Sequence, residues 1–257
     1  PNSGACRARN RAFELSTGDY IQFLDADDLL DPDKIKNQMR RIGPETADRI
    51  LSGRYVRFYE GQEFPPKPLA KGPLERSWDD PIAWLVKEWE GHGMGVTQIW
   101  LCARKQIADA GGWNESLSVN QDGEFFCRVL LRSKGIVFCD DSMSYYRSGI
   151  PGSVSQRRSD DRKAQDLLKS IQLYEKNILP VEDSPRVRKA LAVKYSTYVY
   201  GHYDSHPTLA SEAKARVHAL GFAKLPLTGG ENFRKMSRII GFENSLKVRS
   251  LVRRFAK

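Results

Sequence analysis

The stretch that decides the fold is Gly18-Asp19-Tyr20-Ile21-Gln22-Phe23-Leu24-Asp25-Ala26-Asp27-Asp28, in which a short apolar run leads straight into three carboxylates. Residues 20–24 have the composition of a buried strand, and ligands of open α/β sheets bind beyond the carboxyl ends of strands. Neighbouring carboxylates repel one another unless a cation joins them. Oxygen ligands suit Mg²⁺ or Mn²⁺, which are commonly shared with substrate phosphates. The stretch therefore predicts a site for a metal and a diphosphate.

An alternative reading assigns these carboxylates to the start of the next helix. Pro32 suits the first turn of that helix, with Asp31 as its N-cap. Capping accounts for Asp31. It does not account for Asp25 and Asp27, because a cap needs one carboxylate at the N-cap position and these two directly follow a strand. We therefore interpret Asp25 and Asp27 as the metal and diphosphate ligands.

Residues 1–156 alternate helical and β-rich segments, a pattern typical of an α/β fold. Apolar residues at helical spacing predict helices over residues 5–17, 78–90, 105–110 and 124–132. Short β-rich runs predict strands over residues 50–59, 97–103, 136–139 and 143–146. The chain opens on a loop entering a helix, so we expect it to begin inside a domain.

A polar linker at residues 149–159 separates this part from a helical extension, residues 157–257. Helical spacing recurs over residues 160–178, 185–202, 208–220 and 232–256, and Gly241 is expected to break the last helix. Residues 157–257 hold 21 Lys or Arg against 10 acidic residues, whereas residues 1–156 hold 20 against 22. This excess suits an anionic partner (a membrane surface, nucleic acid or a polyanionic acceptor) and equally suits a solvated helix surface.

The final basic, amphipathic segment is suited to docking on a membrane surface, and it is equally suited to plain packing of a terminal helix. No apolar run approaches the roughly 20 residues of a membrane-spanning helix. The four cysteines, at positions 6, 102, 127 and 139, show no zinc-ligand spacing, so we expect reduced core cysteines. The expected location is the cytoplasm, with peripheral contact at the inner face of the membrane.

The acidic stretch resembles the central signature of family 2 glycosyltransferases of the GT-A fold, and the match extends to flanking residues: Ala8-Arg9-Asn10, Leu30, Pro32, Lys34, Ile35 and Gln38. The resemblance implies a Rossmann-like mixed sheet flanked by helices, here lacking its first βαβ portion. In that family the Asp-x-Asp motif binds the metal and the ribose-diphosphate of a nucleotide sugar. Carried over, Asp25 and Asp27 hold Mn²⁺ or Mg²⁺ and the donor, with Arg9 in the donor site.

A second acidic segment resembles the acceptor side of the same family: Gly111 to Leu117, then Asn120-Gln121-Asp122-Gly123-Glu124-Phe125-Phe126-Cys127-Arg128. The family's general base corresponds to Asp122. Displacement at an anomeric carbon needs one base to deprotonate the acceptor hydroxyl. A nearby helix N-terminus would lower the pKa of Asp122, and an apolar wall would raise it. The alternatives are that Asp122 only caps the helix, and that Glu124 is the base, holds the acceptor or caps the helix.

Two further residues enter the predicted site. In relatives the region of Tyr145-Tyr146-Arg147 covers the donor phosphates, so Arg147 is a candidate phosphate ligand; a surface Arg is the alternative. Trp113 is a candidate for stacking on an acceptor sugar, and a core Trp is the alternative. The Gln-x-x-Arg-Trp motif of processive sugar synthases is absent from the sequence, which argues against a polymerising enzyme.

The leading hypothesis is an inverting transfer of one sugar from a nucleotide-diphosphate donor to a hydroxyl acceptor, a glycan or a lipid-linked glycan. A metal-dependent phosphohydrolase or nucleotidyltransferase would need more acidic or His ligands, and the four His residues show no such grouping. A non-catalytic module that binds nucleic acid is the third hypothesis, but the sequence has no recognition motif. We therefore expect a glycosyltransferase of polysaccharide or glycolipid assembly, without a nucleic-acid partner.

Overall fold

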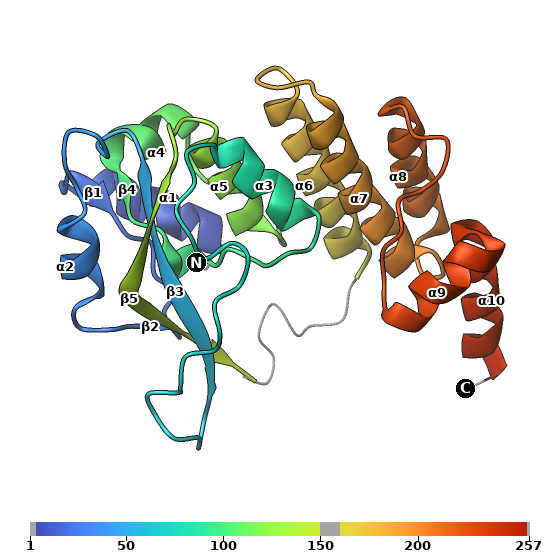
Figure 1. Ribbon diagram of the computed structural model, residues 1–257, viewed down its shortest axis with the longest axis horizontal. Coiled ribbons are helices and arrows are strands. Elements are labelled where there is room, and N and C mark those ends of the chain that lie inside the picture. Colours follow the sequence, from blue (N-terminus) through green and yellow to red (C-terminus); the bar gives the residue numbers. More distant parts are fainter. Residues whose placement is uncertain (1–3, 150–159, 256–257) are drawn as a thin grey trace. The chain divides into compact units, whose positions relative to one another are not determined.

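The computed structural model describes residues 4–149 and 160–255 of the 257-residue chain (Figure 1). The chain separates into two compact units, Pro1–Arg158 and Ser159–Lys257. The first unit is mixed α/β and the second is helical. No helix among the described residues is long and apolar enough to cross a bilayer.

The first unit is built on two long strands, β3 (Ile50–Tyr59) and β5 (Ile136–Ser148), which pair in parallel. A short strand, β2 (Leu29–Leu30), joins the other edge of β5 in antiparallel sense, so the described sheet has the order β2-β5-β3. β1 (Tyr20–Ile21) and β4 (Cys102–Ala103) form a separate antiparallel pair. A bridge between Leu51 and Leu101 connects β3 to the segment before β4.

Helices lie on both sides of β3 and β5, with α2 on one side in Figure 1 and α1, α3 and α5 on the other. The mixed sheet flanked by helices confirms the predicted fold class. The helices of this unit are α1 (Ala5–Leu15), α2 (Lys34–Met39), α3 (Pro81–Trp89), α4 (Arg104–Ala110) and α5 (Gln121–Leu130), with a 3₁₀ turn η1 (Thr97–Ile99).

Local chemistry moves several boundaries from where the sequence places them. The predicted strand over residues 97–103 divides into η1 at its start and β4 at its end, and the predicted strands 136–139 and 143–146 are one strand, β5. α2 begins at Lys34, with Asp33 at its N-cap position and no side-chain cap, and the Asp31 carboxylate two residues earlier accepts a hydrogen bond from the Asp33 backbone N–H at 3.1 Å. The predicted N-cap at Asp31 is therefore wrong.

The second unit comprises α6 (Asp161–Ile178), α7 (Pro185–His202), α8 (Pro207–Ala219), α9 (Glu231–Ile240) and α10 (Phe242–Phe255). Glu175 of α6 is buried, and it accepts hydrogen bonds from Tyr195 of α7 at 2.6 Å and from Arg216 of α8. This charged group is retained in the interior because both partners satisfy it. Gly241 adopts φ 82° between α9 and α10, which confirms the predicted break.

The register of β3 against β5 shifts between Gly53 and Arg54. A Cβ at Gly53 would lie 2.5 Å from the Ser142 carbonyl oxygen, a backbone atom that cannot move aside cheaply. Glycine is therefore required here by close approach of two backbones.

We predict that Gly53→Ala lowers the free energy of unfolding of the first unit by about 1–3 kcal/mol, because the added methyl forces the two strands apart. All five tryptophans lie between residues 78 and 113, so tryptophan fluorescence in urea reports on this unit. Gly43→Ala is the matched control, since a Cβ there meets no atom within 4 Å. Equal stability of Gly53→Ala and Gly43→Ala would contradict the prediction.

Candidate active site

The acidic stretch forms a tight turn beyond β1, closed by a hydrogen bond from the Asp28 N–H to the Asp25 carbonyl at 3.1 Å. Asp27 is exposed, whereas Asp28 is only 4% exposed. One carboxylate oxygen of Asp28 accepts a hydrogen bond from the Arg147 N–H at 2.8 Å, and the other is buried without a partner among the described residues. Burial, with the charges of Asp27 and Asp25 adding to it, raises the pKa of Asp28 to about 6.

Arg147 extends from β5 beside this turn. Its Nε donates a hydrogen bond to the Asp27 carbonyl at 3.0 Å, and its guanidinium lies 4.8 Å from the ring centre of Phe58. β5 thus holds both the backbone and the side chain of Arg147 against the acidic turn. A cation at this position suits the phosphate role that the sequence suggests for it.

Arg9 connects the acidic turn to the second acidic segment. Its guanidinium forms an ion pair with Asp25 and a 3.4 Å hydrogen bond with the side-chain oxygen of Gln121, the first residue of α5. The guanidinium also lies over the Trp113 ring, 4.4 Å from its centre. Because Arg9 comes from α1, three separate chain segments meet at one cation.

Aromatic packing also holds the acidic turn and the second acidic segment together. Phe23, two residues before Asp25, meets Trp113 edge-on at 5.2 Å and Phe125 at 5.6 Å between ring centres. Phe125 lies three residues after Asp122 and stacks on Trp113 at 4.2 Å. Each such contact contributes about 0.5–1.5 kcal/mol beyond its burial. One aromatic cluster therefore holds the segment that follows β1 against the start of α5.

Asp122 lies in the first turn of α5, and the N-cap position is occupied by Asn120 with φ 53°. The Asp122 carboxylate accepts a 2.9 Å hydrogen bond from the Gly123 N–H. Burial raises the pKa of Asp122 and outweighs this hydrogen bond and the positive charge of Arg9, while the charge of Asp25 raises it further. Of the two opposing influences foreseen from the sequence, burial is thus the stronger.

Glu124 is buried and is committed to Arg128, whose Nε and Nη2 donate to its two oxygens at 2.8 and 2.9 Å. The same guanidinium donates to the carbonyls of Gly111 and Gly112. Glu124 therefore holds α5 to the end of α4 and presents no open carboxylate to an acceptor.

Trp113 is 3% exposed, and its ring is covered by Phe125 and Arg9. It therefore offers no open face for stacking on a sugar. Asn10 fixes its backbone: the side-chain oxygen accepts from the Trp113 N–H at 2.7 Å, and the side-chain nitrogen donates to the Trp113 carbonyl at 3.0 Å. Asn10 thus clamps the loop between α4 and α5, a role that its place in the sequence does not indicate.

Sequence reasoning missed a buried lysine behind the acidic turn. Lys34 is fully buried, and its ammonium donates to the side-chain oxygens of Gln22 at 2.6 Å and Gln38 at 2.8 Å. The amide groups of Gln22 and Gln38 donate in turn to the carbonyls of Gln98 and Ile99. This network ties α2 and η1 to the segment that leads into Asp25. Burial lowers the pKa of Lys34 to about 7.

The carboxylates of the acidic turn suit a metal ion that a substrate phosphate would also hold. Within residues 4–149 and 160–255, no three His, Cys, Asp or Glu side chains group as a metal cage. Mg²⁺ sites that bind phosphates usually need only one or two carboxylates, with phosphates and waters completing the shell. The exposed Asp27 and the unpartnered oxygen of Asp28 fit that arrangement. Asp25, an expected ligand, is engaged by Arg9.

The sequence of this chain is similar to known glycosyltransferase sequences over part of its length. The family model Glycosyl transferase family 2 matches residues 1–114. The putative teichuronic acid biosynthesis glycosyltransferase TuaG of Bacillus subtilis (strain 168) is 31% identical over 81 residues, which are 32% of this chain. The matched part of this chain spans 31% of the length of that relative.

Solved structures share the fold over nearly the whole chain. S. aureus TarS 1-349 in complex with UDP-GlcNAc matches 98% of this chain and 72% of its own, with a TM-score of 0.62 and 16% identity. TarS 1-349 in a second crystal structure matches 100% of this chain and 73% of its own, with a TM-score of 0.60 and 16% identity. The likeness confirms a GT-A-like mixed sheet followed by a helical C-terminal region.

We predict that the stability of the first unit depends on pH through Lys34. Between pH 7 and 10.5 the unfolded chain holds a proton on Lys34 that the folded chain lacks, so stability rises with pH in that window, by at most about 1.4 kcal/mol per pH unit. Lys34→Met removes this dependence. The free energy of unfolding of the wild type, minus that of Lys34→Met, therefore increases from pH 7 to pH 9.

Tryptophan fluorescence in urea measures both proteins. Lys36→Met is the matched control, because Lys36 lies on the same helix with its side chain 59% exposed. A difference between wild type and Lys34→Met that stays constant with pH would contradict the prediction.

Proposed function

We propose that this chain, whose residues 1–114 match the model of glycosyl transferase family 2, moves a single sugar from a nucleotide-diphosphate sugar to a hydroxyl acceptor with inversion at the anomeric carbon. The observation that carries the proposal is the meeting at Arg9 of the acidic turn and the first turn of α5. In the sequence these segments resemble the donor side and the acceptor side of the family pattern. One site with both halves is what a direct displacement requires.

The donor half consists of the acidic turn and Arg147. The Arg147 guanidinium is suited to a phosphate of the donor, and Arg9 orients Asp25 toward the donor ribose-diphosphate. The complex of TarS with UDP-GlcNAc supports a nucleotide sugar as the class of donor. A Mn²⁺ or Mg²⁺ ion would be held by Asp27 with Asp28 and Asp25 beside it, and it would neutralise the charge of the departing diphosphate.

The acceptor half centres on Asp122. Its carboxylate removes the proton of the acceptor hydroxyl as the bond to the anomeric carbon forms, and the partial burial that raises its pKa makes it a stronger base than an exposed Asp. Glu124 and Trp113 support Asp122 indirectly. Glu124 anchors α5 through Arg128, and Trp113 packs against Arg9.

The acceptor that we propose is a glycan or a lipid-linked glycan of surface polysaccharide assembly. The relative named for teichuronic acid biosynthesis supports this class. The basic excess of residues 157–257 is compatible with a polyanionic acceptor chain.

We predict that Asp27→Ala abolishes metal-dependent release of nucleoside diphosphate, and that Asp122→Asn lowers sugar transfer by about 10²–10⁴-fold. The measurement is turnover of a panel of nucleotide sugars by the full-length protein, with Mn²⁺ or with EDTA. Asp33→Ala is the matched control, because the Asp33 side chain is 60% exposed and pairs only with Lys36 among the described residues.

Two results would overturn the proposal. If no donor is turned over and none binds in a metal-dependent way, an enzymatic function is excluded. Release of phosphate from simple phosphate esters, without sugar transfer, would favour a metal-dependent phosphohydrolase in its place.

A further inference from the structure

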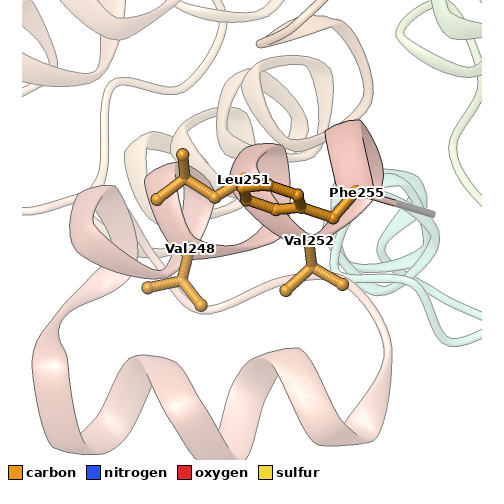
Figure 2. A pocket seen from close by; sticks show the side chains of 4 residues that line it. All are labelled: Val248, Leu251, Val252 and Phe255. Carbon is orange, nitrogen blue, oxygen red and sulfur yellow. The ribbon is translucent and has the colours of Figure 1, made fainter. Parts of the chain in front are cut away.

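Helix α10 carries two apolar stripes, of which its own unit covers only one. The inward stripe packs into the unit through Phe242, Ser245 and Leu246, which are buried. The second stripe has the spacing i, i+3, i+4 and i+7 of a helix face that is normally covered. Its members are Val248, Leu251, Val252 and Phe255, whose side chains are drawn in Figure 2.

The outer stripe is open to solvent. Leu251 is 52% exposed, Val252 61% and Phe255 89%, and the four side chains line a shallow hollow of about 480 Å³. The preceding helix, α9, also carries an exposed apolar side chain, that of Ile239, which is 85% exposed. Solvated apolar side chains at helical spacing are typical of a surface that another phase or partner covers.

Positive charge is concentrated in the same two helices, α9 and α10. Residues 231–255 contain seven Lys or Arg and only two acidic residues. Arg249 and Arg253 lie near Asp204, at 3.8 and 3.4 Å. By contrast, three exposed cations form no ion pair among the described residues: Arg234, Arg238 and Lys247. The surface thus combines an apolar stripe with uncompensated positive charge.

We propose that α9 and α10 form a docking surface for an anionic lipid bilayer, in which the Val248–Phe255 stripe enters the headgroup boundary and the cations meet lipid phosphates. An apolar stripe with Lys and Arg beside it is the arrangement of interfacial helices. The surface is too small for a stable pair of copies of the chain, because a standard protein interface uses about 20–30 residues on each side. This inference does not depend on the proposed sugar transfer.

The test is flotation of the full chain with phosphatidylcholine vesicles that contain or lack phosphatidylglycerol. We expect binding to the anionic vesicles only, weakened at high salt. Leu251→Ser with Val252→Ser lowers the partition coefficient at least about tenfold, and Lys247→Ala lowers it about fivefold. All three residues are exposed, so the variants keep their helical circular dichroism.

Val181→Ser is the matched control, because Val181 is 52% exposed on the same unit, between α6 and α7, and lies outside the docking surface. Equal binding to neutral and anionic vesicles would overturn the proposal, as would equal binding of the double variant and Val181→Ser. Self-association that the double variant abolishes, without vesicle binding, would assign the stripe to a contact between copies of the chain.

Discussion

The ion pair between Arg9 and Asp25 is the interaction on which the rest of the site depends. Asp25 and Asp122 come from segments almost a hundred residues apart, and two carboxylates in a partly buried space repel each other. Arg9 lies against both segments: it pairs with Asp25 and donates to Gln121, the residue before Asp122. Its flat guanidinium can serve both while resting on the Trp113 ring, which the point charge of a lysine could not do.

The layers behind this cation are arranged to keep it in place. The aromatic cluster of Phe23, Trp113 and Phe125 aligns the segment after β1 with the start of α5. Lys34 holds the same segment through its hydrogen bond to the side chain of Gln22. Glu124 and Arg128 fasten α5 to the glycines before Trp113. Much of the buried polar chemistry of the first unit therefore positions the acidic turn and does not itself face a substrate.

Sequence reasoning succeeded where the signal is local. Alternation of strand and helix patterns, the long strand at residues 50–59 and the break at Gly241 follow from periodicity and from glycine's freedom, and the structure confirms them. It was weaker where tertiary contacts decide. The start of α5 at Gln121 and that of α2 at Lys34 have no side-chain cap, so no local capping signal marks them in the sequence. The burial of Lys34 has no local signature, because a lysine at helical spacing normally lies in solvent.

The central claim is that Arg9 joins the two acidic segments into one electrostatic unit, and the pKa of the Asp122 carboxyl tests it most directly. That pKa can be followed by carbon NMR of the side-chain carboxyl in the wild type and in Arg9→Met, without any requirement for activity. Because the charge of Arg9 lowers the pKa of Asp122 and that of Asp25 raises it, removal of Arg9 takes away one lowering influence and leaves the effect of Asp25 in place. The account predicts a higher pKa for Asp122 in Arg9→Met than in the wild type, and an unchanged pKa would contradict it.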